Sequence, residues 1–307
     1  MDAAISLRFS TQAQSDLRRM TQELSDLQRQ VASGSKADDL RGFGAGSAQL
    51  LNAQTLKATT DSRSSVINEL QARFGVQTTA LDQVASMAKM MSQSIGQAIS
   101  ANDGRGVSTD LGIAFSNIVS ALNETWNGQP LFAGERQGAG PIKITSLDQL
   151  VAAASPQDIY QEATRSQQID LGTGTPITLA PKASDISQDL FATLKTLKQI
   201  VDLHGGQIGQ PIDADVQAQL QGIANALNKQ ATVFTNEEGR AGQLQTRFSS
   251  EATRLSQRSD LLTNEITTQT GSDMATVSIK LNLLMTQYQA AAKTFSDLSK
   301  LSLLNYL

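Results

Sequence analysis

The chain has 307 residues, a formal net charge of −4 and no cysteine. The lack of cysteine excludes disulfides, thiolate catalysis and cysteine-ligated metals, and the dispersed charges form no basic cluster of the kind that binds nucleic acid. Hydrophobic residues make up 39% of the chain but aromatic residues only 4%, which favours long helices with narrow apolar seams over a compact globule.

The positions of the six prolines divide the chain into three parts. All six lie between Pro130 and Pro211, so both flanking segments lack the strongest helix breaker. We therefore expect a mainly α fold: an elongated helical rod with paired N- and C-terminal coiled-coil helices and a small mixed α/β or β insert. The domains predicted on this basis are a terminal coiled-coil assembly domain (1–35 with 272–307), a helical rod domain (36–130 with 185–271) and a small β-containing insert domain (131–184).

The N-terminal arm begins with a heptad pattern. Its apolar residues recur at alternating steps of four and three, as in the seam of a coiled coil. They are Ala13, Leu17, Met20, Leu24, Leu27 and Val31. The pattern ends at the glycine-containing stretch "SGSKADDLRGFGAGS". We expect a flexible turn there, because a phosphate-binding loop would follow a strand and end in Gly-Lys-Ser/Thr.

A second, longer helix is predicted from about residue 48 to residue 101. Its apolar stripe from Ile67 to Ala98 is interrupted only at Gln77, and we interpret it as intramolecular core. The stretch "NDGRG" then predicts a turn, followed by a third helix over about residues 107–127. In the insert, "PIKIT" and "PITLA" predict short strands, "LGTGTP" a turn, and "TSLDQLVAAA" a short capped helix.

The C-terminal arm is helical again and carries a second heptad seam. A helix after Pro181 is expected to end at Gly205 and Gly206, and "TGSD" is expected to break the last long helix before the seam begins. A seam cannot be buried by one helix alone, so we expect the two terminal helices to pair. Ile279, Leu283 and Leu301 would remain exposed, which predicts neighbouring copies.

The predicted assembly interface therefore combines both seams and the apolar end of the sequence. Its residues are Ala13, Leu17, Met20, Leu24, Leu27, Val31, Val277, Leu281, Leu284, Tyr288, Phe295, Leu298, Leu301, Leu304 and Tyr306.

No motif predicts catalysis, a metal site or a cofactor. His204 is the only histidine, and we interpret it as a polar helix-terminal residue. "NDGRG" lacks the spacing of a calcium-binding loop. The insert carboxylates Asp148, Asp158, Glu162 and Asp170 could serve a glycan-cleaving enzyme, but nothing singles out a pair among them. We expect no membrane span, and "MDAAISLRFS" lacks the pattern of a Sec signal peptide.

Several stretches resemble the flagellin superfamily. "ASGSKADDLRGFG" is similar to the segment after its first helix, "GRAGQLQTRFSSEATRLSQRSDLLTNEIT" to its long late helix, and "GSDMATVSIKLNLLMTQYQAAAKTFSDLSKLSLLNYL" to its C-terminal helix. The likeness covers both arms, about two thirds of the chain. It implies a non-enzymatic structural protein of the bacterial flagellum, located outside the cell, exported by the flagellar type III apparatus and bound on its C-terminal helix by a cytosolic chaperone.

Two further stretches bear on which kind of member this is. "TWNGQPLFAGERQ" and the final "LSLLNYL" are more similar to the hook–filament junction members than to filament flagellins, although the "MRIS"-like opening is missing and "SGSKA" replaces "RINS". This resemblance implies a ring between a preceding hook-associated protein and the first flagellin layer, with copies of itself as further partners. The alternative is a minor flagellin that polymerises into the filament. A type III translocator would need a membrane-competent apolar stretch, which is absent.

Overall fold

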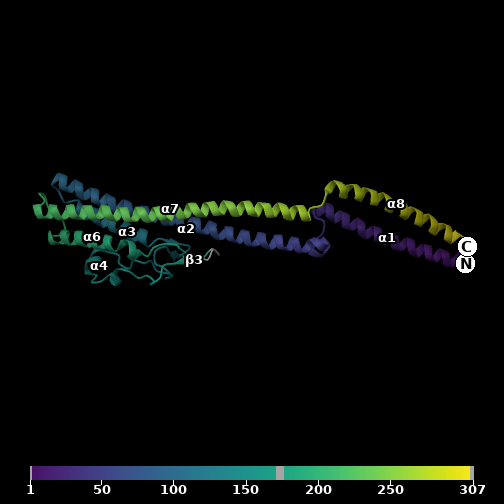
Figure 1. The fold of residues 1–307 in the computed structure, drawn as a ribbon, viewed down its shortest axis with the longest axis horizontal. Coiled ribbons are helices and arrows are strands. Elements are labelled where there is room, and N and C mark those ends of the chain that lie inside the picture. The colour runs from purple at the N-terminus through teal and green to yellow at the C-terminus, as the bar shows by residue number, and fades with distance from the viewer. Residues whose placement is uncertain (1, 171–175, 305–307) are drawn as a thin grey trace. The chain divides into compact units, whose positions relative to one another are not determined.

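A computed structural model describes residues 2–170 and 176–304, with side chains described for residues 11–170 and 176–297. The chain divides into two compact units. Unit 1 comprises Met1–Ser64 and Arg254–Leu307, and unit 2 comprises Ser65–Thr253. Two long helices, α2 (Ser47–Ala101) and α7 (Ala214–Thr270), contribute residues to both units (Figure 1).

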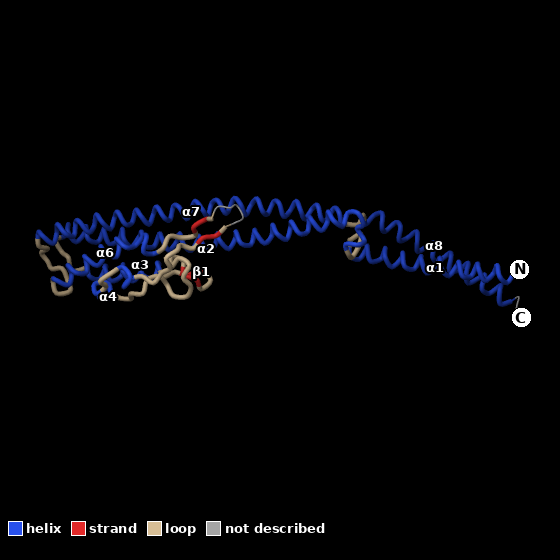
Figure 2. Tube along the Cα trace, turned by 60° about the horizontal axis from the view of Figure 1, so that its bottom comes forward, coloured by secondary structure: helices blue, strands red, loops and turns tan. Residues whose placement is uncertain are grey.

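Unit 1 contains the two terminal helices. Helix α1 (Asp2–Ser33) and helix α8 (Met274–Leu304) lie side by side (Figures 1 and 2). The predicted pairing of the two terminal helices is therefore confirmed. In the same unit the first turns of α2 meet the last turns of α7, where Gln49 Nε2 donates to Glu265 Oε1 at 3.1 Å and the Ser259 hydroxyl donates to Asp61 at 2.6 Å.

The glycine-containing stretch after α1 is more ordered than predicted. Residues Leu40–Gly46 form a short 3₁₀ helix, η1, whose N-cap Asp39 accepts a hydrogen bond from the Gly42 amide at 3.1 Å. Only Gly44, at φ 54°, departs from helical geometry inside η1. The stretch is a turn between longer helices, as predicted, and glycine at positive φ allows the kink between its short 3₁₀ turns.

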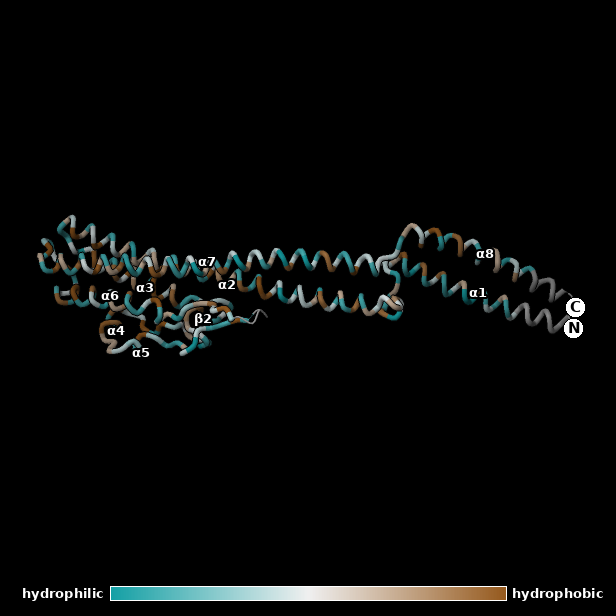
Figure 3. Tube along the Cα trace, viewed as in Figure 1, coloured by the Kyte–Doolittle hydropathy of each residue, from teal (hydrophilic) through white to brown (hydrophobic). Residues whose placement is uncertain are grey.

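Unit 2 is built on four helices, the two long ones with α3 (Val107–Leu122) and α6 (Ala183–Leu203). The Ser92 hydroxyl on α2 donates to the Ala224 carbonyl on α7 at 2.8 Å, and the rings of Phe74 and Phe248 lie 5.5 Å apart. The predicted stripe from Ile67 to Ala98 is largely buried here, including Gln77. Figure 3 shows how brown apolar residues recur along these helices.

The third helix is shorter than expected. It ends at Leu122 rather than near Asn127, and a hairpin follows in which β1 (Thr125–Trp126) pairs antiparallel with β2 (Gln129–Pro130). The two residues between the strands, Asn127 and Gly128, have φ values of 50° and 74°. Asn-Gly is the preferred pair for a two-residue hairpin turn with positive φ at both positions, and this signal is what the helix prediction overlooked.

The insert is mostly loop with short elements (Figure 2). Helix α4 (Leu147–Ala152) is capped by the Ser146 hydroxyl, as predicted, and a further turn, α5 (Pro156–Ile159), follows. "PITLA" contributes β4 (Ile177–Thr178), which pairs with β3 (Gln168–Ile169). "PIKIT" is not a strand: it makes one isolated bridge, from Ile142 to Tyr160. The predicted turn "LGTGTP" falls largely on 171–175, outside the described residues.

The mainly helical fold with paired terminal helices and a small strand-containing insert is thus confirmed. The breaks at "NDGRG", after α6 and at "TGSD" are also confirmed, with Gly205 and Gly206 at φ 77° and 91°. The three-domain division stays a prediction.

One turn of unit 2 supplies a test of its packing. A Cβ added to Gly104 would lie 2.7 Å from Ile208 Cβ and closer still to its Cγ2. The Gly104 amide also donates to the Gly209 carbonyl at 3.2 Å. The backbone of Gly104 is therefore held in place, and Ile208 occupies the space that a side chain would need. We expect Gly104→Ala to lower the free energy of unfolding by about 1–3 kcal/mol in chemical denaturation, because overpacking must displace Ile208 or the turn.

The matched control is Gly112→Ala in α3, where an added Cβ meets nothing within 4 Å. Alanine there is expected to stabilise the helix by about 0.5–1 kcal/mol. Equal effects of the two substitutions would show that the turn does not pack against Ile208 as described.

Candidate assembly surface

The residues predicted to form the assembly interface lie on two helices that contact each other. Leu27 of α1 with Val277 and Leu284 of α8 form a buried apolar cluster. Partly buried side chains pack against it: Met20, Leu24, Val31 and Leu281. Heptad spacing accounts for this arrangement, because it places each of these side chains on the face that meets the partner helix.

The remaining predicted residues are less enclosed or are not described. The half-buried side chains are those of Ala13, Leu17, Tyr288 and Phe295. Leu298, Leu301 and Leu304 belong to α8, but their side chains lie outside the described part, as does the whole of Tyr306. Contact between the heptad seams and neighbouring copies of the chain stays a prediction, since the seams already serve to pair α1 with α8.

A second face of α8 carries apolar side chains with no cover. Ile279 is 69% exposed and Leu283, one turn on, is 58% exposed, as the sequence led us to expect. Met274 and Met285 are also exposed. A helix that is apolar on more than one face is characteristically buried on more than one side. Ile279 and Leu283, four positions apart, lie on one side of the helix, and we call these two residues the outer face of α8.

Exposed large apolar side chains are concentrated in unit 1. Among the residues with described side chains, unit 1 holds eight of them: Leu40, Leu51, Leu56, Leu261, Met274, Ile279, Leu283 and Met285. Unit 2, although larger, holds five: Val66, Met90, Ile113, Leu203 and Val233. Single exposed leucines are ordinary, whereas a contiguous apolar patch marks an interaction surface. The sequence analysis missed most of these residues, because they lie off the heptad seams.

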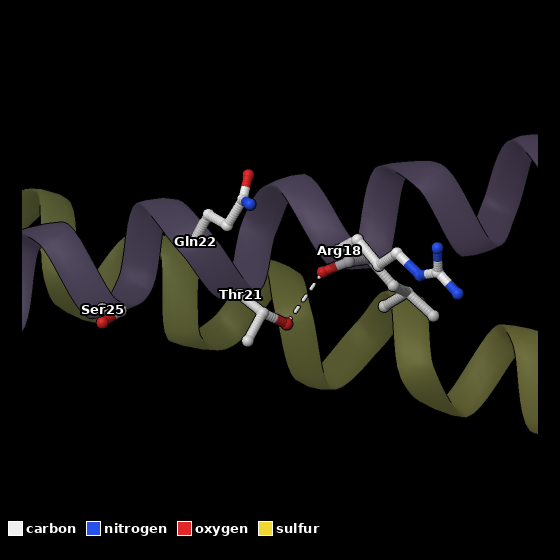
Figure 4. Close-up of a pocket in the computed structure, with 5 residues that line it drawn as sticks. Arg18, Thr21, Gln22 and Ser25 are labelled. Atoms are coloured by element: carbon white, nitrogen blue, oxygen red, sulfur yellow. Dashed lines mark hydrogen bonds between the residues drawn. The ribbon is translucent and has the colours of Figure 1, made fainter.

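Unit 1 also has two open grooves. One, of about 450 Å³, lies on α1 and is lined by Leu17, Arg18, Thr21, Gln22 and Ser25. Figure 4 shows Arg18 and Gln22 extending from α1 beside the α8 ribbon, while the Thr21 hydroxyl turns back to the Leu17 carbonyl at 2.9 Å. The other, of about 470 Å³, lies between η1 and the end of α7, with Phe43, Gln49, Glu265 and Gln269 in its wall.

The carboxylates of the insert have structural partners instead of one another. Asp148 pairs with Lys198 at 3.1 Å, and Glu162 pairs with Lys182 at 3.6 Å and accepts a hydrogen bond from the Ser184 amide at 3.1 Å. Asp158 accepts from the Ser155 amide and hydroxyl, and these bonds hold the pKa of Asp158 below its usual value.

The other groups considered for chemistry are Asp170 and His204. Asp170 is exposed at the end of β3. His204 ends α6 with its Nδ1 2.8 Å from the Ile200 carbonyl, the helix-terminal position expected from the sequence. Across the described residues, no three His, Cys, Asp or Glu side chains are grouped so as to hold a metal ion. Within the same range, no helix has the length and hydropathy needed to cross a membrane.

Both the sequence and the fold resemble those of known proteins. Residues 222–307 match the family described as the bacterial flagellin C-terminal helical region. No curated protein matches the chain by sequence. Among solved structures, a Vibrio parahaemolyticus protein assigned as a flagellar hook-associated protein aligns with a TM-score of 0.57 at 16% identity, covering 73% of this chain and 96% of that one.

The structure of Bacillus cereus FlgL is also similar, with a TM-score of 0.51 at 14% identity, covering 66% of this chain and 98% of that one. At such identities these two likenesses concern the fold. The family match concerns the sequence of the part that contains α8 and most of α7. The chain thus resembles flagellins in the sequence of residues 222–307, and it resembles the two flagellar structures in its fold.

Proposed function

We propose that this protein is a structural, non-enzymatic component of the flagellum that forms the junction between hook-associated proteins and the flagellin filament. The observation that carries the proposal is the exposed apolar surface of unit 1, above all the outer face of α8. The outer face of α8 lies within the segment that matches flagellins, in a chain whose fold resembles those of a flagellar hook-associated protein and of FlgL. A subunit of a ring needs such a surface, because contacts between copies must bury it.

Assembly would proceed through the terminal helices. Leu284 and Leu27 hold α8 against α1 within one chain, which leaves Ile279 and Leu283 free to contact another. Burying one such side chain completely contributes about 1.5–3 kcal/mol, so the outer face can offset a substantial part of the cost of association. The predicted interface also includes Leu298, Leu301, Leu304 and Tyr306, whose side chains lie outside the described part.

The other predicted partners follow from the same role. The preceding hook-associated protein would contact one side of the ring and flagellin the other, and copies of this chain would contact each other. Before assembly, a cytosolic chaperone would cover the C-terminal helix during export through the flagellar type III apparatus. An unguarded apolar helix face is an association hazard in the cytoplasm, which is the physical reason to expect such a chaperone.

Deletion of the gene, followed by electron microscopy, tests the junction role. We expect hooks without filaments and flagellin released into the medium, and complementation with the intact chain should restore attached filaments. Filaments of normal number and length in the deletion strain would contradict the proposal.

A minor filament flagellin is the second candidate, and the match of residues 222–307 with flagellins favours it. Purified protein separates the two roles. A flagellin should polymerise by itself into long filaments when seeded, whereas a junction protein should not elongate without its neighbours.

A further inference from the structure

The residues of the break between α7 and α8 favour a helix end but do not enforce one. Only Gly271, Ser272 and Asp273 separate the two helices, and none of them is a proline. Each of these residue types can occupy a helix interior. A helix that ends leaves its last four carbonyl groups without partners inside the helix, so something else must supply the donors.

Most of these donors come from the N-terminal part of the chain. The Lys36 amide donates to the Thr270 carbonyl at 2.8 Å, and the Lys36 ammonium group donates to the carbonyls of Gln269 at 3.1 Å and Thr268 at 3.4 Å. The fourth carbonyl, of Thr267, accepts from Gly271 at 2.7 Å. One lysine thus satisfies three of the four carbonyls, and its charge lies at the negative end of the helix dipole.

The contact is reciprocal. The Ser272 amide donates to the Gly34 carbonyl at 2.8 Å, and Ser35 and Gly271 form an antiparallel bridge. On the far side of the break, Asp273 starts α8 by accepting from the Thr276 hydroxyl at 2.7 Å and from the Ala275 amide at 3.1 Å. The chain stretch 34–36, which we call the latch, therefore holds the broken form of the helix together.

The broken form also carries a cost. The buried Gln269 Oε1 and Ser272 Oγ have no hydrogen-bond partner, and each such atom loses its solvation without compensation. A Cβ on residue 271 would lie 2.7 Å from the Thr267 carbonyl oxygen, so the broken form requires glycine there. The two unpartnered atoms disfavour the broken form, and the contacts of the latch offset this cost.

We infer that the latch is a conformational switch that decides whether α7 and α8 are two helices or one. When residues 34–36 leave, the carbonyls of Gln269 and Thr270 lose their donors. The amides of Asp273 and Met274 can then supply them in the ordinary i to i−4 pattern, and the helix continues through residues 271–273. Release of the N-terminal segment would thereby change the path of α8. This inference does not depend on the proposed function.

Backbone chemical shifts of the full chain test the switch. In the wild type we expect the Cα shifts of Gly271 to Asp273 to be non-helical. Lys36→Met keeps the apolar stem but removes the ammonium group, and it should move these shifts toward the values of the preceding α7 residues. Exchange of the Met274 amide should slow in the same variant, since that amide gains the Thr270 carbonyl as an acceptor.

Two further variants make the outcome decisive. Gly271→Ala favours the continuous helix on both counts, by helix propensity and by crowding of the broken form, and should shift the same signals further. Lys229→Met, an exposed lysine of α7 in unit 2, makes the same charge change away from the break and should leave them unmoved. Non-helical shifts at residues 271–273 in both Lys36→Met and Gly271→Ala, or an equal change in Lys229→Met, would overturn the inference.

Discussion

Deletion of residues 272–307 is expected to abolish filament attachment while unit 2 stays folded. The core of unit 2 is formed within Ser65–Thr253, with large buried side chains such as Phe74, Phe191 and Phe234 that make no use of α8. In unit 1, by contrast, the deletion removes Val277 and Leu284, and Leu27 loses the cluster that buries it. At about 1.5–3 kcal/mol for each buried apolar side chain, α1 then has no comparable partner within the chain.

Trp126 provides the control for this deletion. It is the only tryptophan, it lies in unit 2, and its fluorescence reports the state of that unit alone. We expect the truncated protein to show an unchanged cooperative transition at Trp126 and no attached filaments when it is expressed in a deletion strain. Attached filaments would show that α8 is dispensable for assembly, and a lost Trp126 transition would show that the two units do not fold separately.

Much of the helical architecture could be read from the sequence, because its signals are local. The alternation of steps of three and four residues located the faces of α1 and α8 that meet, and Leu27, Val277 and Leu284 are the centre of that contact. The absence of proline likewise predicted long helices in both arms, and glycine-containing breaks predicted where helices end. Gly205 and Gly206, both at positive φ, end α6 where the sequence predicts.

The features that were missed depend on a competing local signal or on distant contacts. The Asn127–Gly128 turn displaced the end of α3, and "PIKIT" found one bridge partner rather than a strand to pair with. The latch could not be predicted at all. Lys36 and Thr268 are 232 positions apart in the sequence. No periodic pattern indicates that a lysine in the break after α1 donates hydrogen bonds to the carbonyls at the end of α7.

The candidate assembly surface, too, could be predicted only in part. Heptad positions were found, but Leu51, Leu56 and Leu261 lie outside the two seams, and only the structure shows that they are exposed. A seam pattern specifies one face of a helix, so it is silent on apolar residues of the other faces.

Two neighbouring leucines of α8 separate pairing within the chain from assembly between chains. Leu284 is 7% exposed and belongs to the cluster with Leu27, whereas Leu283 points away from it. Leu284→Asp should therefore destabilise the α1–α8 pair by more than about 3 kcal/mol, since it removes buried apolar contacts and places a carboxylate without a partner among them. Leu283→Asp should change the stability of the monomer by no more than about 0.5 kcal/mol.

In cells, however, both substitutions are expected to abolish attached filaments, because assembly needs the pair that Leu284 maintains and the outer face to which Leu283 belongs. Circular dichroism of the purified monomers and microscopy of complemented deletion strains measure the two effects separately. Asn282→Asp adds the same charge at the adjacent exposed position and should preserve both stability and filaments. If Leu283→Asp supports filaments as well as Asn282→Asp does, the outer face of α8 is not a contact surface, and assembly must depend on the seams alone.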